Sequence, residues 1–261
     1  METNEFREFC RARPDKQNIL DVFKGKWICE VPVDSGLSTG GKVHAFEDFR
    51  IEWLMDAYGE ADGKSILELG PFEGGHAYML SKLDPSLIIS IEANVSCFLK
   101  CLCIKEAFDL GNVEFRLGDF NEYLPNCDRR FDLVVASGVL YHSSDPMALL
   151  ESVCRVSDNL FIWTHYADPD RMQTNPNLKK KFGPLQGGSF RGLDYEFFEQ
   201  TYQYGVTDEE FCGGTGKTSR WLTKDAIVSA LRHFGHKELR YGPDDANHPN
   251  GPSTCLFSRR S

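Results

Sequence analysis

The chain has 261 residues, of which 29 are basic and 39 acidic, so its formal net charge is −10. This balance disfavours a sequence-independent nucleic-acid binder, which needs a lysine- and arginine-rich surface to neutralise phosphates. With 41% apolar and 26% charged residues, the composition is that of a globular protein with a sizeable core. The polar N-terminus lacks the apolar run of a signal peptide, and no run reaches the ~18–20 apolar residues of a membrane helix. We therefore expect a soluble, cytoplasmic protein that has no membrane partner.

Nine cysteines are scattered along the chain, and none of them forms a Cys-x-x-Cys pair. Cys97 and Cys101 fall on a common face of one expected helix, but a zinc site needs more ligands at a defined spacing. We therefore expect no metal site and interpret the cysteines as small buried hydrophobes with free thiols. Free thiols indicate a reducing compartment.

Short apolar runs alternate with longer amphipathic segments through the middle of the chain. This alternation is typical of a parallel sheet that is covered by helices on both faces. Asp145 followed by Pro146 predicts the start of one helix, and Thr223 predicts the N-cap of another. Three prolines between the last two strands leave too little helical pattern for a parallel crossover, so we expect these strands to be antiparallel. The expected strands are 64–70, 87–91, 113–117, 131–136, 160–164, 237–241 and 253–258.

We expect one α/β domain built from residues 1–261 with three parts. Residues 1–60 form an N-terminal helical extension, and residues 61–166 together with 223–261 form a Rossmann-like core. Residues 167–222 are far too many for a simple strand-to-helix connection, so we interpret them as an aromatic-rich insertion that acts as a substrate pocket or lid.

The most informative motif is Glu68-x-Gly70-x-x-x-Gly74, in which an expected strand ends in a glutamate and runs through a glycine turn into a helix. Loops at the carboxyl ends of parallel strands are where such sheets bind ligands. The glycines are four residues apart, whereas a dinucleotide fingerprint has Gly-x-Gly-x-x-Gly. An acidic residue at this point suits an amine better than a pyrophosphate, so the motif indicates a ligand with an ammonium group.

Two further acids follow the next two expected strands. Glu92 can accept hydrogen bonds from both hydroxyls of a ribose. Asp119 can accept one from an adenine amino group, and Phe120 can flank the ring. Each of these features is weak alone, but three acids at consecutive strand ends predict a nucleoside-type ligand.

With these motifs, and with the segment from Gly138 to Pro146 that reads Gly-Val-Leu-Tyr-His-Ser-Ser-Asp-Pro, the sequence resembles class I S-adenosylmethionine-dependent methyltransferases. It is similar to the branch that contains the tRNA wobble-uridine carboxymethyltransferases, to which Trp221-Leu-Thr-Lys224 also points. The resemblance implies a seven-stranded sheet with order 3-2-1-4-5-7-6 and an antiparallel seventh strand. It also implies S-adenosyl-L-methionine as the cofactor. The residues that would hold it are Glu68, Gly70, Phe72, Gly74, Glu92, Ala93, Asp119, Phe120, Ser137 and Gly138. At 71–73 the chain has Pro-Phe-Glu, where the family commonly has a Cys/Ala-Gly-Thr/Ser run.

Candidate catalytic residues follow the fourth and fifth strands. A general base, needed for a hydroxyl acceptor, adds roughly 10²–10⁴-fold to the rate. His142 is the first choice, with Tyr141 and His165 as the other candidates, and a structural role is the alternative for each histidine. The segment Gly213–Thr218 resembles a phosphate loop only loosely, and a hinge of a lid is the better interpretation. The basic run Lys179–Lys181 is interpreted as a solvated helix face.

We expect an enzyme that methylates an oxygen or nitrogen of a small-molecule acceptor, and leave a homodimer open. One alternative is an RNA methyl- or carboxymethyltransferase acting on a tRNA wobble uridine, which the acidity disfavours but does not exclude. Such an enzyme would want cationic residues near the sulfonium, for which the candidates are Lys26, Arg50, Lys217 and Arg220. A second alternative is a non-catalytic regulator that binds the cofactor. The glycine spacing and Glu68 disfavour a nicotinamide oxidoreductase.

Overall fold

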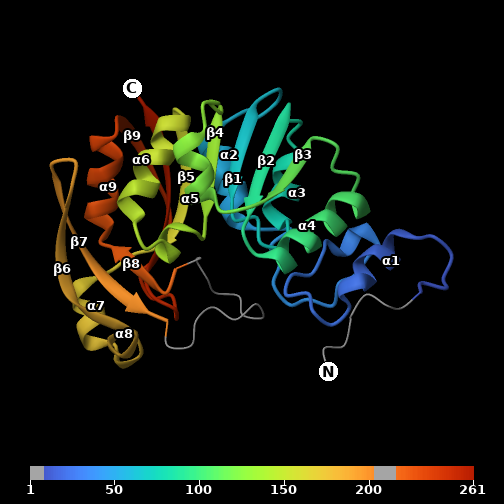
Figure 1. Ribbon diagram of the computed structural model, residues 1–261, viewed down its shortest axis with the longest axis horizontal. Helices are drawn as coiled ribbons and strands as arrows, with labels where there is room; N and C mark the ends of the chain where they lie inside the picture. Colours follow the sequence, from blue (N-terminus) through green and yellow to red (C-terminus); the bar gives the residue numbers. More distant parts are fainter. Residues whose placement is uncertain (1–8, 203–215) are drawn as a thin grey trace.

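One seven-stranded sheet forms the centre of the molecule in the computed structural model, which describes residues 9–202 and 216–261. Its strands are β1 (Ser65–Leu69), β2 (Leu87–Glu92), β3 (Val113–Leu117), β4 (Leu133–Ser137), β5 (Asn159–His165), β9 (His236–Asp245) and β10 (Ser253–Arg260). They follow the order β3-β2-β1-β4-β5-β10-β9 (Figure 1). Strands β1 to β5 pair in parallel, and β10 is antiparallel to both β5 and β9. The predicted strand order and the antiparallel seventh strand are therefore confirmed.

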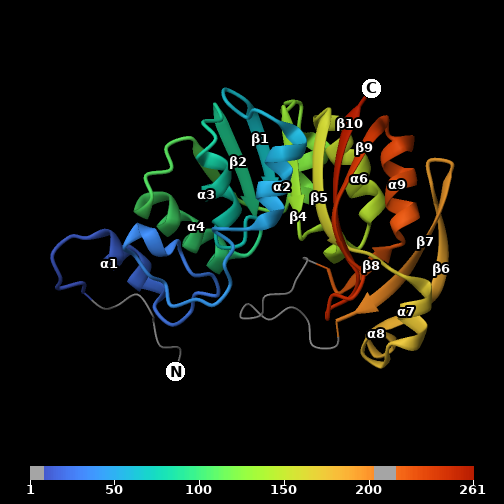
Figure 2. The same cartoon turned by 180° about the vertical axis from the view of Figure 1, so that it is seen from behind.

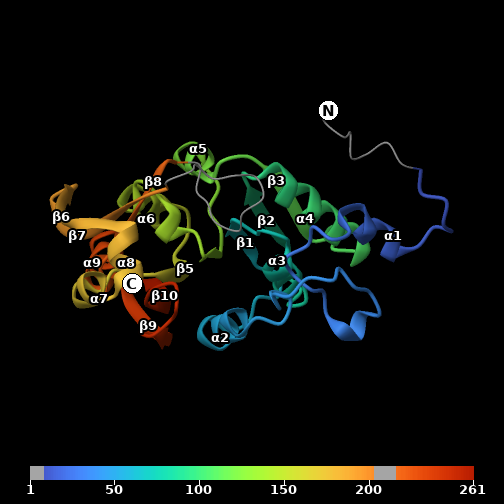
Figure 3. The same cartoon turned by 90° about the horizontal axis from the view of Figure 1, so that it is seen from below.

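Helices cover both faces of this sheet (Figure 3). One face packs against α2 (Phe49–Tyr58), α3 (Gly75–Ser81) and α4 (Val95–Ala107). The other face packs against α5 (Phe120–Tyr123), α6 (Pro146–Val156) and α9 (Lys224–His233). Because side chains alternate along a strand, Ile66 joins the first core and Leu67 joins the second. Complete burial of such a side chain stabilises the fold by about 1.5–3 kcal/mol.

Two predicted N-caps are present. The carboxylate of Asp145 accepts a hydrogen bond from the Ala148 amide at 3.1 Å, and Pro146 occupies the first turn of α6. The hydroxyl of Thr223 accepts one from the Ala226 amide at 3.2 Å at the start of α9. Each cap satisfies a backbone N–H that would otherwise have no partner inside the helix, which is why these residue types mark helix starts.

The insertion contains two short helices and a second sheet. The helices are α7 (Pro169–Thr174) and α8 (Pro176–Lys181), and the antiparallel strands are β6 (Phe182–Phe190), β7 (Leu193–Thr201) and β8 (Thr218–Leu222) in the order β6-β7-β8. The sequence did not predict this sheet, because Gly183, Pro184, Gly187 and Gly188 weaken the strand pattern of β6. The ring of Tyr195 lies over Gly188, where a Cβ would come within 2.7 Å of it. Lys179–Lys181 are exposed at the end of α8, as predicted.

The N-terminal segment and the insertion lie at opposite ends of the molecule in both side views (Figures 1 and 2). The helix α1 (Lys16–Leu20) packs against α4, next to the amino-terminal half of the core. Short 3₁₀ turns lie at 21–23, 33–35, 124–126 and 140–142. The phosphate-loop-like segment starting at Gly213, and with it the expected hinge, falls largely outside the described residues.

Candidate active site

A buried glutamate lies at the carboxyl end of β1. Glu68 faces the α3 and α4 side of the sheet, opposite its neighbours Leu67 and Leu69. Its Oε2 accepts a hydrogen bond from Ser90 Oγ at 2.6 Å across the parallel β1–β2 pair. Its Oε1 is buried and has no hydrogen-bond partner among the residues that the structure describes. Burial raises the pKa of Glu68 to about 7, against the opposing effect of the Ser90 hydrogen bond. The free oxygen fits a ligand that supplies a cationic donor.

The turn after β1 requires glycine at two positions. Gly70 has a φ of +65° and donates its N–H to the Ile91 carbonyl at 3.0 Å. A Cβ at Gly70 would lie 2.8 Å from Cγ1 of Val139, so a side chain does not fit there. Gly74 has a φ of +84° and forms the N-cap of α3. These glycines let the chain leave β1 and enter α3 through two left-handed positions that other residues rarely adopt.

Glu92 ends β2 and is engaged by two backbone amides. Its Oε2 accepts from Phe72 N at 3.0 Å, and its Oε1 accepts from Asn94 N at 2.8 Å. Burial raises the pKa of Glu92, and the hydrogen bonds from the backbone amides of Asn94 and Phe72 oppose this rise. Each carboxylate oxygen keeps a second lone pair, so the group has the capacity to accept two ribose hydroxyls as well. The half-buried Ala93 lies between Glu92 and the start of α4.

Asp119 and Phe120 follow β3. The Oδ1 of Asp119 accepts from Asn121 N at 2.8 Å and caps α5, a role that the sequence analysis did not assign. Phe120 is half-buried and packs against the core on the α6 side. The adenine contact of these residues stays a prediction.

The end of β4 brings a glycine against β5. Gly138 has a φ of +84° and donates its N–H to the Trp163 carbonyl at 2.9 Å. The hydroxyl of Ser137 is buried and has no hydrogen-bond partner within 9–202 and 216–261. Side chains alternate along β4, so Ser137 faces the same side of the sheet as Leu133 and Val135. This is also the side that Glu68 faces.

His165, at the end of β5, has a defined tautomer. Its Nδ1 lies 2.8 Å from the carbonyl oxygen of Gly251 and 3.2 Å from that of Pro252, so Nδ1 holds the proton and donates it. The Nε2 atom therefore has the lone pair. The ring stacks on Trp221 with centroids 5.1 Å apart and an interplanar angle of 5°. Burial lowers the pKa of His165 to about 4, so the ring is neutral near pH 7.

His142 lies in the 3₁₀ turn after β4 and contacts the insertion. Its Nδ1 is 3.0 Å from the Tyr202 hydroxyl, which donates to Ser219 Oγ at 3.3 Å. Burial, and then the nearby His165, lower the pKa of His142 to about 4. The Tyr141 ring lies 4.1 Å from the His142 ring and 4.7 Å from the His165 ring. The structure thus brings the three predicted catalytic residues into one cluster.

A charged group at the start of α2 borders this cluster, and the sequence analysis singled out only its Arg50. Arg50 and Asp48 form an ion pair at the start of α2, and His76 Nε2 lies 3.0 Å from Asp48 Oδ2. Burial raises the pKa of Asp48, but the hydrogen bonds from His76 and Arg50 outweigh it and hold the pKa well below its usual range. The Arg50 guanidinium lies 4.3 Å from the Trp163 ring centroid, and the Trp163 and His165 rings are 5.2 Å apart. The N-cap pattern at Asp48 was the one available signal.

A family model described as a methyltransferase domain matches residues 60–191, just over half of the chain. The chain belongs to this methyltransferase family. The predicted family and enzyme class are therefore confirmed. Among the described helices, none is long and apolar enough to cross a membrane. No group of three or more potential metal-ligating side chains occurs in 9–202 or 216–261.

The methyltransferase has curated relatives and solved neighbours. It is 28% identical over 120 residues to the tRNA U34 carboxymethyltransferase of Campylobacter hominis, and the match covers 45% of this chain and 41% of that protein. The match to the Desulfotalea psychrophila enzyme of the same name is 30% identical over 91 residues and covers 35% of this chain and 28% of that protein. The chain thus matches about two fifths or less of the length of these relatives.

Two solved structures share the fold of this methyltransferase. The N-terminal domain of EvdMO1, solved in the presence of SAH and D-fucose, has a TM-score of 0.71 and 22% identity and covers 94% of this chain and 95% of its own. Magnesium protoporphyrin IX methyltransferase from Synechocystis PCC 6803, with bound SAH, has a TM-score of 0.54 and 15% identity, with 82% and 81% coverage. At these identities, the likenesses establish the fold.

In this methyltransferase the departure at residues 71–73 has a structural reason. Glu73 does not join the candidate cofactor site but turns toward the N-terminal segment, where it accepts hydrogen bonds from the amides of Ile28 and Cys29. Phe72 presents its N–H to Glu92 and its carbonyl oxygen to Cys101 Sγ. The turn therefore contacts the candidate site through Phe72 and the rest of the fold through Glu73.

Proposed function

We propose that the protein transfers a methyl group from S-adenosylmethionine to an oxygen or nitrogen of a small-molecule acceptor. The observation that supports this most is that three groups lie at the same edge of the sheet. Two are buried carboxylates at the ends of adjacent strands, and the third is a histidine whose tautomer is fixed. The carboxylates are Glu68 and Glu92, and the histidine is His165. Parallel β1, β2, β4 and β5 all end at that edge, which is where such sheets bind ligands.

The residues of the turn fit the proposed cofactor. The buried Oε1 of Glu68 suits the ammonium of the methionine part of the cofactor. Glu92 would hold the ribose hydroxyls, while Asp119 and Phe120 would contact the adenine. Solved neighbours of the same fold contain SAH or SAM, which agrees with this choice.

The cofactor supplies an electrophilic methyl on its sulfonium, and the protein's own residues position the acceptor and take up its proton. Positioning a nucleophile in line accounts for up to ~7–11 kcal/mol of a barrier. We assign proton uptake to Nε2 of His165, because hydrogen bonds to two carbonyls fix the lone pair on that atom. His142 then positions the insertion through Tyr202. The aromatic rings of Tyr141, Trp163 and Trp221 surround His165 and would exclude water from the acceptor.

A tRNA acceptor is the second candidate, since the curated relatives are named tRNA U34 carboxymethyltransferases. Transfer of a carboxymethyl group would favour an unpaired cation near the sulfonium. Of the candidate cations, Arg50 pairs with Asp48 and Arg220 lies 3.3 Å from Glu199. These ion pairs and the net charge of −10 favour methyl transfer to a small molecule.

To test this, the protein is incubated with methyl-labelled S-adenosylmethionine and one of two acceptor pools. One pool is a low-molecular-mass metabolite extract, and the other is total tRNA. We expect label in the metabolite pool, and simple sugars are the first compounds to try individually, because the EvdMO1 neighbour was solved in the presence of D-fucose. Label in tRNA would instead support the second candidate. A cofactor-binding regulator would transfer label to neither pool.

A matched pair of variants tests the proton acceptor. His165→Gln should lower kcat with a hydroxyl acceptor by about 10²–10⁴-fold while S-adenosylhomocysteine affinity stays the same. His142→Gln should weaken acceptor binding more than it lowers kcat. The reverse pattern would assign the base to His142.

A further inference from the structure

A buried ion pair connects the turn after β1 to helix α4. Glu73 has no exposed surface, and its Oε1 lies 2.6 Å from Nζ of Lys100. Lys100 is 6% exposed, and its Nζ also donates to the Lys26 carbonyl at 2.6 Å. A pair this deep costs desolvation energy that hydrophobic residues of the same volume would not cost, so stability alone does not account for it.

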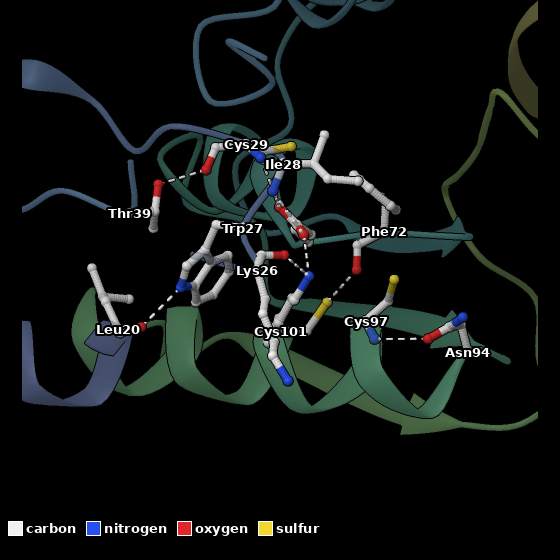
Figure 4. Close-up of polar contacts among 12 residues, drawn as sticks. Leu20, Lys26, Trp27, Ile28, Cys29, Thr39, Phe72, Asn94, Cys97 and Cys101 are labelled. Carbon is white, nitrogen blue, oxygen red and sulfur yellow. Dashed lines mark hydrogen bonds and ion pairs between the residues drawn. The ribbon is translucent and has the colours of Figure 1, made fainter. Parts of the chain in front are cut away.

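The same carboxylate holds the N-terminal segment. Oε2 of Glu73 accepts from the amides of Ile28 at 3.0 Å and Cys29 at 2.8 Å. We call residues 26–29 the anchor segment. Within it, Trp27 Nε1 donates to the Leu20 carbonyl at 2.8 Å (Figure 4). One side chain from the turn therefore fixes a segment that is more than 40 residues away in sequence.

The residue before Glu73 has a strained backbone. Phe72 has a φ of +57°, a left-handed conformation that costs a non-glycine residue energy and persists only where its surroundings enforce it. Its N–H donates to Glu92 Oε2 at 3.0 Å, and its carbonyl accepts from Cys101 Sγ at 3.2 Å. The strain thus lies at the point where the turn meets the carboxylate assigned to the ribose.

We propose that Glu73 and Lys100 are a positioning pair for the cofactor. By holding the turn against the anchor segment, the pair keeps Phe72 left-handed and its N–H on Glu92, so that the carboxylate is already oriented when the ribose arrives. This inference rests on the proposed function. Because coupling between two sites is reciprocal, cofactor binding and ordering of the anchor segment then strengthen each other.

Hydrogen–deuterium exchange on the wild-type chain tests the coupling. Saturating S-adenosylhomocysteine should slow exchange of the Ile28 and Cys29 amides about tenfold, within the usual range of coupling between sites. If S-adenosylhomocysteine binds but leaves this exchange unchanged, the inference is wrong while the proposed function stands. If the wild-type chain does not bind it at all, both are wrong.

A neutral double variant, Glu73→Gln with Lys100→Met, tests the pair itself. We expect the Kd for S-adenosylhomocysteine to rise about tenfold, while kcat at saturating cofactor changes by less than about twofold. Adding Phe72→Gly should recover most of the lost affinity, since glycine adopts the left-handed conformation without strain. Equal affinity of the double variant and the wild type would overturn the inference.

The matched control is Glu30→Gln. Glu30 lies next to the anchor segment, and its Oε1 accepts from the Thr39 amide at 3.0 Å without contacting the turn. This variant should bind S-adenosylhomocysteine as the wild type does. A loss of affinity equal to that of the double variant would show that any disturbance of the N-terminal segment suffices, which contradicts a specific role for Glu73 and Lys100.

Discussion

Replacing Glu68 by glutamine should stabilise the ligand-free protein at neutral pH and weaken its binding of the cofactor. Burial raises the pKa of this carboxyl from 4.5 to about 7, and its Oε1 has no partner among the described residues. The folded state therefore keeps a proton that the unfolded chain releases. Between these two pKa values the folded state binds more protons, so stability falls as the pH rises.

The size of the effect follows from the shift. One pKa unit corresponds to about 1.4 kcal/mol, so the charged Glu68 costs the folded state about 3 kcal/mol above pH 7. Most of this cost develops between pH 5 and pH 8. In Glu68→Gln the cost is absent, and the difference in stability between the variant and the wild type should grow by most of that amount over the same range. An ammonium ligand removes the penalty in the wild type only, so the variant should bind S-adenosylhomocysteine about ten- to hundredfold more weakly.

Urea denaturation of both proteins at pH 5 and pH 8 measures this difference, in which the contributions of other titrating groups cancel. The matched control is Glu114→Gln, an exposed glutamate on β3, which should change stability by less than about 0.5 kcal/mol at either pH. A difference between Glu68→Gln and the wild type that stays constant from pH 5 to pH 8 would refute the reasoning.

Three more predictions concern the acceptor side. Because burial lowers the pKa of His165 to about 4, kcat should be flat from pH 6 to pH 8, and an acid limb near pH 6.5 in the rate profile would contradict this. Gly251→Ala should lower kcat by a larger factor than it lowers cofactor affinity. The new Cβ would lie 2.5 Å from the Trp221 ring and would displace the carbonyl that holds His165. Wild-type turnover in this variant would contradict the prediction. Asp48→Asn should lower the free energy of unfolding at pH 7 by about 2 kcal/mol, measured by thermal or urea unfolding, because Arg50 loses its charged partner. Unchanged stability would argue against a stabilising ion pair between Asp48 and Arg50.

The core of the fold was predictable because its signals are local. The apolar runs of β1 to β5 and the caps at Asp145 and Thr223 each depend on a few neighbouring residues. The strand order, in contrast, came from the family resemblance, since pairing is a long-range property. The strands of the insertion lacked a local signal, because β6 contains glycine and proline where a strand usually has β-branched residues.

The site was predictable where a motif marks it and not where contacts are long-range. Glu68 and Glu92 stand out in sequence because each lies at the end of an apolar run, and Gly70 follows Glu68 closely. The contact of Asp48 with His76 joins two helices, and that of Glu73 with Lys100 joins a turn to a helix, so neither leaves a spacing pattern. The carbonyls of Gly251 and Pro252 accept hydrogen bonds from His165. Because every residue has a backbone carbonyl, the sequence does not indicate these contacts.

Calorimetric titration with S-adenosylhomocysteine and with NAD tests the central claim most directly. We expect one S-adenosylhomocysteine to bind per chain and NAD not to bind. We also expect that Glu92→Ala loses the binding, since this carboxylate is assigned to the ribose hydroxyls. Binding of NAD without S-adenosylhomocysteine would contradict the claim. Undiminished S-adenosylhomocysteine affinity in Glu92→Ala would contradict the placement of the cofactor at the end of β2.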